Sequence, residues 1–366
     1  MRGEVAELTA ELVRIDSVNP DLVPEAAGEG EIARFVAEWL ARAGLEVTLD
    51  EVAPGRPNVV GIARGRGSAR SLLLNAHMDT VGVAGMTAPF EPRVDDGRLH
   101  GRGSYDMKGS LAAIMLAGAD AARRGLRGDV LVTAVCDEEV ASIGTAAVAE
   151  RYRADAAIVS EPTELRLALA HKGFVAFEIE VAGRAAHGSR PDLGVDAIAR
   201  TGHVLVRLED LDRRLRADPA HPLLGSGSLH ASLISGGQEY SSYPERCLLR
   251  GERRTIPGET VELVEAELAE LLGGLDGECR VVVAREPFET AEDAEIAALV
   301  ARHAGSPDVV GVPFWADSAL LASAGIPAVV FGPAGEGAHA VEEWVDLASV
   351  ERCVEVYTAV AAELCA

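Results

Sequence analysis

Each of four apolar runs in this sequence leads into side chains that can bind a metal ion or move a proton. The runs are Ser71–Thr80, which ends in His77 and Asp79, Asp129–Cys136 before Glu138 and Glu139, Ala156–Ser160 before Glu161, and Pro327–Gly332 before His339. Such apolar runs are typical of strands buried on both faces of a sheet. Because ligands of open α/β sheets bind beyond the carboxyl ends of the strands, we expect these side chains to line one cleft.

A further carboxylate, Asp106, lies in the glycine-bracketed segment Gly101–Gly109, just before a predicted helix. The helix should begin near Lys108, because apolar residues then recur at spacings of three and four. A carboxylate ahead of a helix interacts favourably with the free backbone N–H groups there. Gly-Arg-Gly before an acid is also common in ordinary turns, but the neighbouring exits make Asp106 the candidate centre of a metal site.

These residue types suit a pair of divalent cations such as Zn²⁺. Imidazole and carboxylate are zinc ligands, and a shared carboxylate allows two ions about 3.5–4 Å apart to activate one water. One of Glu138 and Glu139 could bind metal while the other acts as general base. His77 and Asp79 are two residues apart in an extended segment, so one could bind metal while the other steadies it.

Motifs for other hydrolytic and nucleotide chemistries are absent from the sequence. It has no Gly-x-Ser-x-Gly, no His-Glu-x-x-His and no P-loop, and the glycines at 101 and 103 lack the third glycine of a dinucleotide-binding turn. The sequence therefore argues against a serine hydrolase, a single-zinc protease and a nucleotide-binding protein.

The order of predicted elements indicates two domains. Residues 172–283 predict an insertion between 1–171 and 284–366 with the order βαββαβ. Its elements are a strand at His171–Val181, a helix at Val195–Leu215, strands at Ser228–Ser235 and Arg246–Arg254, a helix at Glu259–Leu272 and a strand at Cys279–Ala284. We therefore expect an α/β catalytic domain with a mixed, mostly parallel sheet flanked by helices, plus an inserted α+β domain.

Composition restricts the partners of this chain. Its 366 residues carry 58 acidic against 34 basic side chains, a net charge of -24 that repels phosphate backbones and anionic lipids. We therefore expect neither nucleic acid nor membrane as a partner. The five cysteines form no Cys-x-x-Cys pair, and the start of the chain reads as a charged amphipathic helix, so we expect a cytoplasmic protein with reduced thiols.

With these motifs in order, the chain resembles the M20 metallopeptidases and deacylases, a family that includes acetylornithine deacetylase, succinyl-diaminopimelate desuccinylase, aminoacylase and carboxypeptidase G2. The segments that carry the resemblance are His77-Met-Asp-Thr80, Gly101–Gly109, Asp137-Glu-Glu139, Ser160-Glu-Pro-Thr163, Ala186-His-Gly-Ser-Arg-Pro191 and Gly337-Ala-His-Ala-Val-Glu-Glu-Trp344. The resemblance implies that His77, Asp106 and Glu161 hold one metal ion, and that Asp106, Glu139 and His339 hold the second.

The resemblance also implies roles for residues that bind no metal. Asp79 would orient His77, Glu138 would be the general base, and His187 would stabilise the oxyanion, often from the partner subunit. The inserted domain would serve as a lid and hold a homodimer together. Two divalent ions are implied, Zn²⁺ first, with Co²⁺ or Mn²⁺ as alternatives.

Two positions depart from the family pattern. Ser241 stands three residues before Pro244, where the family commonly has Asn, which alters a usual substrate or oxyanion contact. The family's Asp-x-Arg-x-x-Pro-Gly begins here with Glu252 but keeps Arg254, which could clamp a substrate carboxylate or simply pair with a surface acid.

The expected activity is hydrolysis of the amide bond of an N-acyl amino acid, in the manner of acetylornithine deacetylase. The alternatives are a dipeptidase or carboxypeptidase, or a hydrolase similar to succinyl-diaminopimelate desuccinylase, acting on a short peptide or related small molecule. A non-catalytic metal-binding relative is a further possibility, although such a protein would be expected to have lost a ligand or the base.

Overall fold

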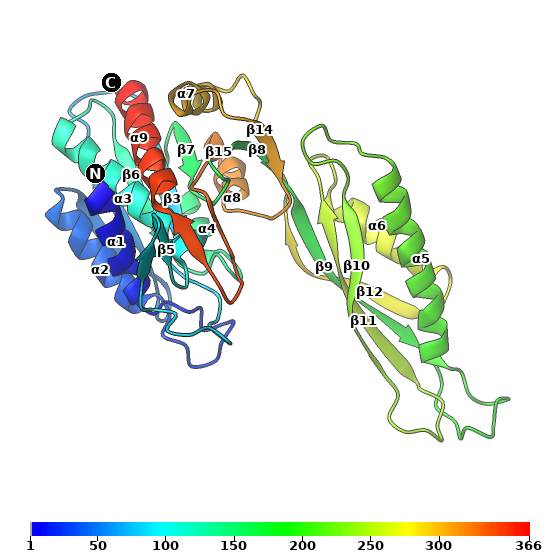
Figure 1. Ribbon diagram of the computed structural model, residues 1–366. Helices are drawn as coiled ribbons and strands as arrows, with labels where there is room; N and C mark the ends of the chain where they lie inside the picture. The colour runs from blue at the N-terminus through cyan, green and yellow to red at the C-terminus, as the bar shows by residue number, and fades with distance from the viewer. Residues whose placement is uncertain (1) are drawn as a thin grey trace. The chain divides into compact units, whose positions relative to one another are not determined.

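The computed structural model describes residues 2–366, which form two compact units (Figure 1). The first unit contains the chain up to Leu169, Thr290–Val310 and Ala316–Ala366. The second contains Ala170–Glu289 and Gly311–Trp315. Phe288 and Trp315 belong to the second unit, where the Phe288 ring stacks on His171 at 5.1 Å and the Trp315 ring meets it edge-on at 6.1 Å.

A mixed sheet has the order β1-β2-β6-β3-β7-β15-β8-β13, with β14 paired to β8, and most of its strands lie in the first unit, whereas β13 belongs to the second. The strands are β1 (Glu46–Ala53), β2 (Arg56–Ala63), β3 (Leu72–His77), β6 (Val130–Val135), β7 (Ala156–Val159), β8 (Leu167–His171), β13 (Phe288–Glu289), β14 (Val309–Val312) and β15 (Ala328–Val330). The pairs β6-β3, β3-β7 and β7-β15 are parallel, and antiparallel strands flank them. The predicted α/β class with a mixed sheet is confirmed, and its parallel part is the centre.

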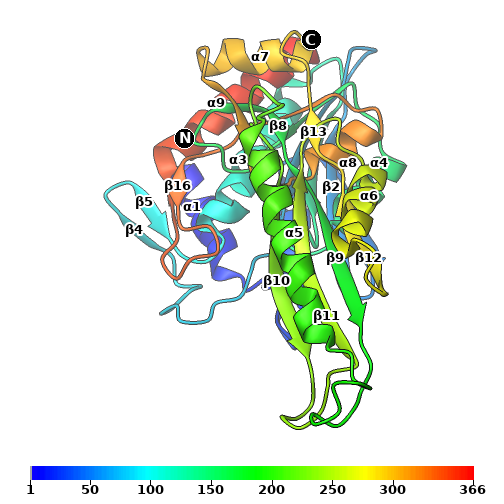
Figure 2. The same ribbon diagram turned by 90° about the vertical axis from the view of Figure 1, so that its right-hand side faces the viewer.

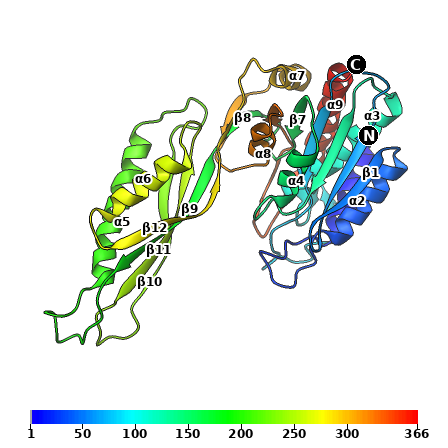
Figure 3. The ribbon, with the colours of Figure 1, turned by 180° about the vertical axis from the view of Figure 1, so that it is seen from behind.

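Helices cover both faces of this sheet, and its central strands are therefore buried along their whole length. The helices are α1 (Arg2–Arg14), α2 (Gly30–Arg42), α3 (Gly109–Arg124), α4 (Ile143–Arg151), α7 (Glu295–Ala304), α8 (Ser318–Ser323) and α9 (Leu347–Leu364). The helices α2, α3 and α9 pack on one face, and α4 and α8 lie together on the other, which Figure 3 shows from behind. None of the described helices is both long and apolar enough to cross a membrane.

A second, small sheet supports two loops of the first unit. It has the order β16-β17-β5-β4, formed by Gly335–Glu336, Trp344–Asp346, Arg98–His100 and Arg93–Asp95. After β5 the chain makes one irregular turn, η1 (Ser104–Lys108), whose backbone is not helical at Asp106 and Met107, before α3 begins at Gly109. The loop between β16 and β17 carries His339, so this sheet sets the bases of both the Asp106 and the His339 loops.

The second unit contains the order βαββαβ. Its elements are β9 (Gly173–Ala182), α5 (Ala197–Ala217), β10 (Ser228–Gly236), β11 (Arg246–Thr255), α6 (Val261–Leu272) and β12 (Gly277–Arg285), and the antiparallel sheet order is β10-β11-β9-β12. Figure 2 shows α5 and α6 side by side over one face of this sheet.

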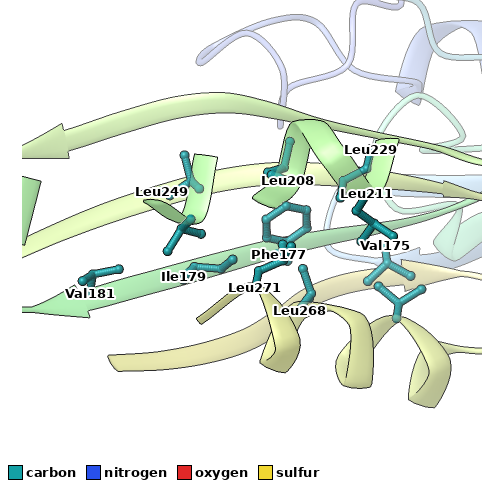
Figure 4. Close-up of a cluster of buried hydrophobic side chains, with 12 residues drawn as sticks. Val175, Phe177, Ile179, Val181, Leu208, Leu211, Leu229, Leu249, Leu268 and Leu271 are labelled. Atoms are coloured by element: carbon teal, nitrogen blue, oxygen red, sulfur yellow. The ribbon is translucent and has the colours of Figure 1, made fainter. Parts of the chain in front are cut away.

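The core of the second unit lies between those two helices and the sheet. Phe177, Ile179 and Val181 project from alternate positions of β9, and they meet Leu208 of α5 and Leu268 of α6 (Figure 4). This alternation is the period expected of a strand buried on one face. Asp196 and Thr260 cap the two helices by accepting hydrogen bonds from backbone N–H groups of the first turn.

Candidate metal centre

Asp106 lies between two imidazoles in the first unit. Its Oδ1 is 3.1 Å from Nε2 of His77, and its Oδ2 is 3.3 Å from Nε2 of His339. Glu139 Oε2 is 3.1 Å from the same His339 nitrogen, and Glu161 Oε1 is 3.9 Å from His77 Nε2. One carboxylate thus offers an oxygen to each of two adjoining clusters of ligand atoms, which is the arrangement a bridging ligand requires.

Each strand exit contributes to this cluster. His77 is the last residue of β3, and Glu138, Glu139 and Glu161 follow β6 and β7 after short turns. Within residues 2–366, the ligand atoms of His77, Glu138 and Glu161 lie within 4.8 Å of one another, as do those of His77, Asp106 and Glu139. The structure therefore brings together the predicted ligands and the predicted base, with Glu138 among the ligand atoms.

Negative charge predominates in this cluster, in which the carboxylates are mostly buried and His339 is 55% exposed. Burial and then the charge of Glu161 raise the pKa of Glu138, and burial likewise raises the pKa of Glu139 and of Glu161. Hydrogen bonds to Asp106 and Glu139 raise the pKa of His339 to about 10. Burial alone would raise the pKa of Asp106, but hydrogen bonds from His339 and His77 lower it below its ordinary value.

These residues fit divalent cations. Burial penalises the negative charge of three of the carboxyl groups, and hydrogen bonds to Asp106 favour the charged form of both imidazoles. In addition, Oε1 of Glu139 is buried and has no hydrogen-bond partner among the described residues. A buried carboxylate oxygen without a partner is costly, and a metal ion would satisfy it.

The carboxylate of Asp79 contacts more than His77. The nearest hydrogen-bond partner of His77 Nδ1 is the backbone oxygen of Asp79, at 2.9 Å, whereas the Asp79 carboxylate is 3.6 Å away. That carboxylate accepts hydrogen bonds from the backbone N–H groups of Glu138 and Glu139, at 3.1 and 3.2 Å. Asp79 therefore links the His77 strand end to the turn that carries both glutamates.

Sequence reasoning missed the residues behind Asp79. Asn19 donates from Nδ2 to Asp79 at 2.8 Å and to Asp137 at 3.1 Å, and Arg56 donates to Asp137 at 2.8 Å. Arg56 also makes a two-point hydrogen bond with the buried Glu29. A charged residue such as Arg56 beside an apolar strand hints at a buried pair, but its partners are too far along the chain to be read from the sequence.

His187 and Arg254 both lie in the second unit. His187 Nδ1 is 2.8 Å from the hydroxyl of Ser189 and accepts a hydrogen bond from the Ser189 backbone N–H. A β-bridge joins His187 to Ser242, next to the departure at Ser241. Arg254 donates to Glu252 at 2.6 Å, and its guanidinium lies 5.3 Å from the centre of the Phe174 ring.

The fold and the cluster define a metal-dependent hydrolase. The sequence profile described as peptidase family M20/M25/M40 matches residues 73–363. The chain belongs to this family, and the resemblance noted in its sequence is confirmed.

Individual relatives cover the whole chain. An acetylornithine deacetylase of Myxococcus xanthus is 32% identical over 385 residues, which include 100% of this chain and 97% of the relative. Among solved structures, the M20 family metallo-carboxypeptidase Sso-CP2 of Sulfolobus solfataricus has a TM-score of 0.80 at 18% identity, with 98% of each chain covered. YXEP of Bacillus subtilis, described as a dinuclear metal-binding peptidase of the M20 family, has a TM-score of 0.72 at 16% identity and covers 100% of this chain and 98% of its own. At these identities the two structures establish a shared fold.

Proposed function

We propose that this protein hydrolyses the amide bond of an N-acyl amino acid, releasing the acyl group as a carboxylic acid and the amino acid with a free amine. The observation that carries the proposal is the 32% identity to an acetylornithine deacetylase along the whole chain. The cluster around Asp106 supports it, because hydrolysis of an unactivated amide needs the strong electrostatic assistance that such a site supplies.

Five residues would hold two divalent ions. His77, Asp106 and Glu161 would bind one, and Asp106, Glu139 and His339 would bind the other, with one Asp106 oxygen toward each. Bound there, the ions would polarise the amide carbonyl and lower the pKa of the attacking water. We propose zinc as the native metal because imidazole and carboxylate ligands suit it, with Co²⁺ or Mn²⁺ able to replace it.

Glu138 would be the general base. It would take a proton from the attacking water and give that proton to the amide nitrogen as the C–N bond breaks, so that the nitrogen leaves as an amine and the acyl carbon keeps the oxygen of the water. Burial raises the pKa of the Glu138 carboxyl group, which favours uptake of a proton from the water and supports this assignment. Asp79 would keep Glu138 in place through its contacts with the backbone of the 138–139 turn.

The second unit would act as a lid and dimerisation domain, within residues of about 172–283. His187 would stabilise the oxyanion from the partner subunit, and Arg254 would clamp the substrate carboxylate in exchange for its contact with Glu252. Large apolar side chains on the outside of this unit support a homodimer, since Val206, Leu233 and Ile234 are each more than half exposed. A cytoplasmic location stays a prediction from the sequence.

A substrate panel tests the proposed activity. The metal-free protein is reloaded with Zn²⁺, Co²⁺ or Mn²⁺ and offered N-acetyl amino acids, N-succinyl-diaminopimelate and dipeptides, with release of free amine as the measurement. We expect N-acetyl amino acids to be turned over fastest. Preferred turnover of dipeptides would contradict the deacylase assignment, and two tightly bound metals without hydrolysis of any substrate would indicate a non-catalytic relative.

A further inference from the structure

A buried carboxylate, Glu343, lies directly behind the loop that carries Asp106. Its side chain has no exposed surface, and it accepts four hydrogen bonds. The donors are Nη1 of Arg102 at 2.6 Å, the backbone N–H of Gly103 at 2.9 Å, that of Tyr105 at 2.9 Å and that of Asp106 at 3.1 Å. One carboxylate thus accepts hydrogen bonds from three backbone N–H groups of the turn around Asp106.

Arg102 and Glu343 also contact the loop that carries His339. Arg102, whose side chain is 3% exposed, donates from Nη2 to the backbone oxygen of Ala340 at 2.9 Å, next to His339. In return, the backbone oxygen of Glu343 accepts a hydrogen bond from Gly101 at 3.1 Å. Arg102 and Glu343 therefore join two loops that are more than 230 positions apart in sequence, and each loop supplies one residue to the cluster around Asp106.

Both oxygens of Glu343 are needed as acceptors. Oε2 receives Arg102 and Gly103, while Oε1 receives Tyr105 and Asp106, so every contact is with a donor. An amide in this place would turn an NH₂ group toward two of those donors, because Gln has one acceptor oxygen and one donor nitrogen. The site therefore demands a carboxylate, and the isosteric amide cannot satisfy it.

The His339 loop contains two constrained backbone positions. His339 has a φ of +63°, which is uncommon for a residue with a side chain. Gly337 has a φ of +88°, and a Cβ there would lie 1.9 Å from the backbone oxygen of Glu342. The hydrogen bond from Arg102 to the Ala340 oxygen lies directly beside His339, so we expect it to help to hold this backbone.

We propose that Glu343 and Arg102 are positioning residues that set the separation of Asp106 and His339, and thereby the affinity of the second metal site. The inference rests on the proposed function only in taking Asp106 and His339 as metal ligands. Glu343 itself contacts backbone N–H groups and an arginine, so its effect on the metal is exerted through the loops.

The test compares Glu343→Gln with Glu342→Gln. Both changes remove one negative charge from adjacent residues, but Glu342 is exposed and Glu343 is buried, so Glu342→Gln is a matched control for charge. Metal-free proteins, checked for folding by circular dichroism, are titrated with Co²⁺ in a calorimeter and in a spectrophotometer. We expect binding of the second ion to weaken about 10- to 100-fold in Glu343→Gln and to stay within about twofold of wild type in Glu342→Gln.

Two further readouts separate positioning from general loss of structure. The absorption spectrum of bound Co²⁺ reports ligand geometry, and in Glu343→Gln it should change more for the second ion, which uses both Asp106 and His339, than for the first, which uses Asp106 alone of the two. Activity should recover when excess metal is supplied, with KM near that of wild type. A damaged fold would give neither a site-specific spectral change nor recovery with metal.

If Glu343→Gln does not fold, Arg102→Lys is the second variant that tests the inference. Lysine keeps the charge but cannot reach both Glu343 and the Ala340 oxygen, so weaker binding of the second ion is again expected. Wild-type affinity for both ions in a folded Glu343→Gln or Arg102→Lys protein would overturn the inference and leave the proposed function intact. A wild-type chain that binds no metal would instead overturn the proposed function, and the inference with it.

Discussion

Each of the two units contains a buried arginine held by carboxylates, yet the two networks end in different places. In the first unit, Arg56 is 7% exposed and bonds to Glu29 at 2.8 and 2.7 Å. In the second, Arg253 has no exposed side-chain surface and bonds to Glu259 at 2.7 and 3.1 Å and to Glu267 at 3.0 Å. The local chemistry of the two arginines is nearly the same.

The difference lies in what their partners touch next. Arg56 holds Asp137, Asp137 shares Asn19 with Asp79, and Asp79 holds the backbone of Glu138, so this network ends at the proposed base. The carboxylates that hold Arg253 instead have structural contacts. Glu259 also accepts a hydrogen bond from the backbone N–H of Ile256, and Glu267 is part of α6. We therefore expect the ion pairs of Arg56 to influence the proposed base, and those of Arg253 to contribute to stability alone.

The largest effect is expected at the end of the first network. Glu138→Gln should reduce kcat by about 10²–10⁴-fold, the usual contribution of a general base, while both metals stay bound. Glu139→Gln should weaken the second metal as well, because Glu139 is a proposed ligand. Activity assays and metal analysis on both variants measure this contrast, and equal metal loss from the two would show that their roles are wrongly divided.

The second unit should affect chemistry through His187 rather than through its buried arginine. His187→Ala should lower kcat by about 10²–10³-fold without changing metal content, which is the scale measured for one oxyanion donor. Mixed with Glu138→Gln subunits, this variant should regain activity if His187 acts across a dimer, because each heterodimer then has one complete site. Exchange of subunits without any recovery would count against action in trans.

Replacing each arginine by methionine compares the two networks directly. Removing one partner of a buried pair costs about 3–5 kcal/mol of stability, so both Arg56→Met and Arg253→Met should unfold at lower denaturant concentration. At a temperature where both are folded, Arg56→Met should lower kcat about 10- to 100-fold, and Arg253→Met should leave it within about twofold of wild type. Similar kinetics in the two variants would remove the distinction drawn between the networks.

A smaller loss than that of Arg56→Met is expected at Asn19. Asn19→Ala removes the amide that joins Asp79 to Asp137 but leaves the hydrogen bonds that Asp79 accepts from the 138–139 turn, so we expect about a tenfold loss in kcat. Asp21→Asn is the control, since Asp21 contacts the same Arg56 but is 61% exposed. A loss of the same size in Asp21→Asn would point to a general electrostatic effect.

The sequence predicts the fold and the position of the cluster because both depend on short-range patterns. Apolar runs such as 129–136 become the buried strand β6, and polar residues at strand exits must meet at one edge of a parallel sheet. The spacing of His77 and Asp79 indicates that their side chains point the same way. It does not reveal that the backbone oxygen of Asp79 is the nearest partner of His77.

Hydrogen bonds between residues far apart in the sequence cannot be predicted from such short-range patterns. Asn19 reaches Asp79 across 60 positions, and Glu343 reaches Asp106 across 237. The sequence places the start of the helix near Lys108, and α3 begins at Gly109, directly after an irregular turn whose N–H groups at Tyr105 and Asp106 donate to Glu343. No local pattern contains that carboxylate, so the shape of the turn could not be predicted.

The distance of 237 positions between Asp106 and Glu343 also has a consequence for synthesis of the protein on the ribosome. Strands β3, β6 and β7 are complete early in translation, and the second unit is contained almost entirely in the following residues 170–289. The turn at Asp106 lacks its carboxylate partner until Glu343 has been made. We therefore expect a nascent chain to have most of the secondary structure that precedes Glu343 before it can retain a metal ion.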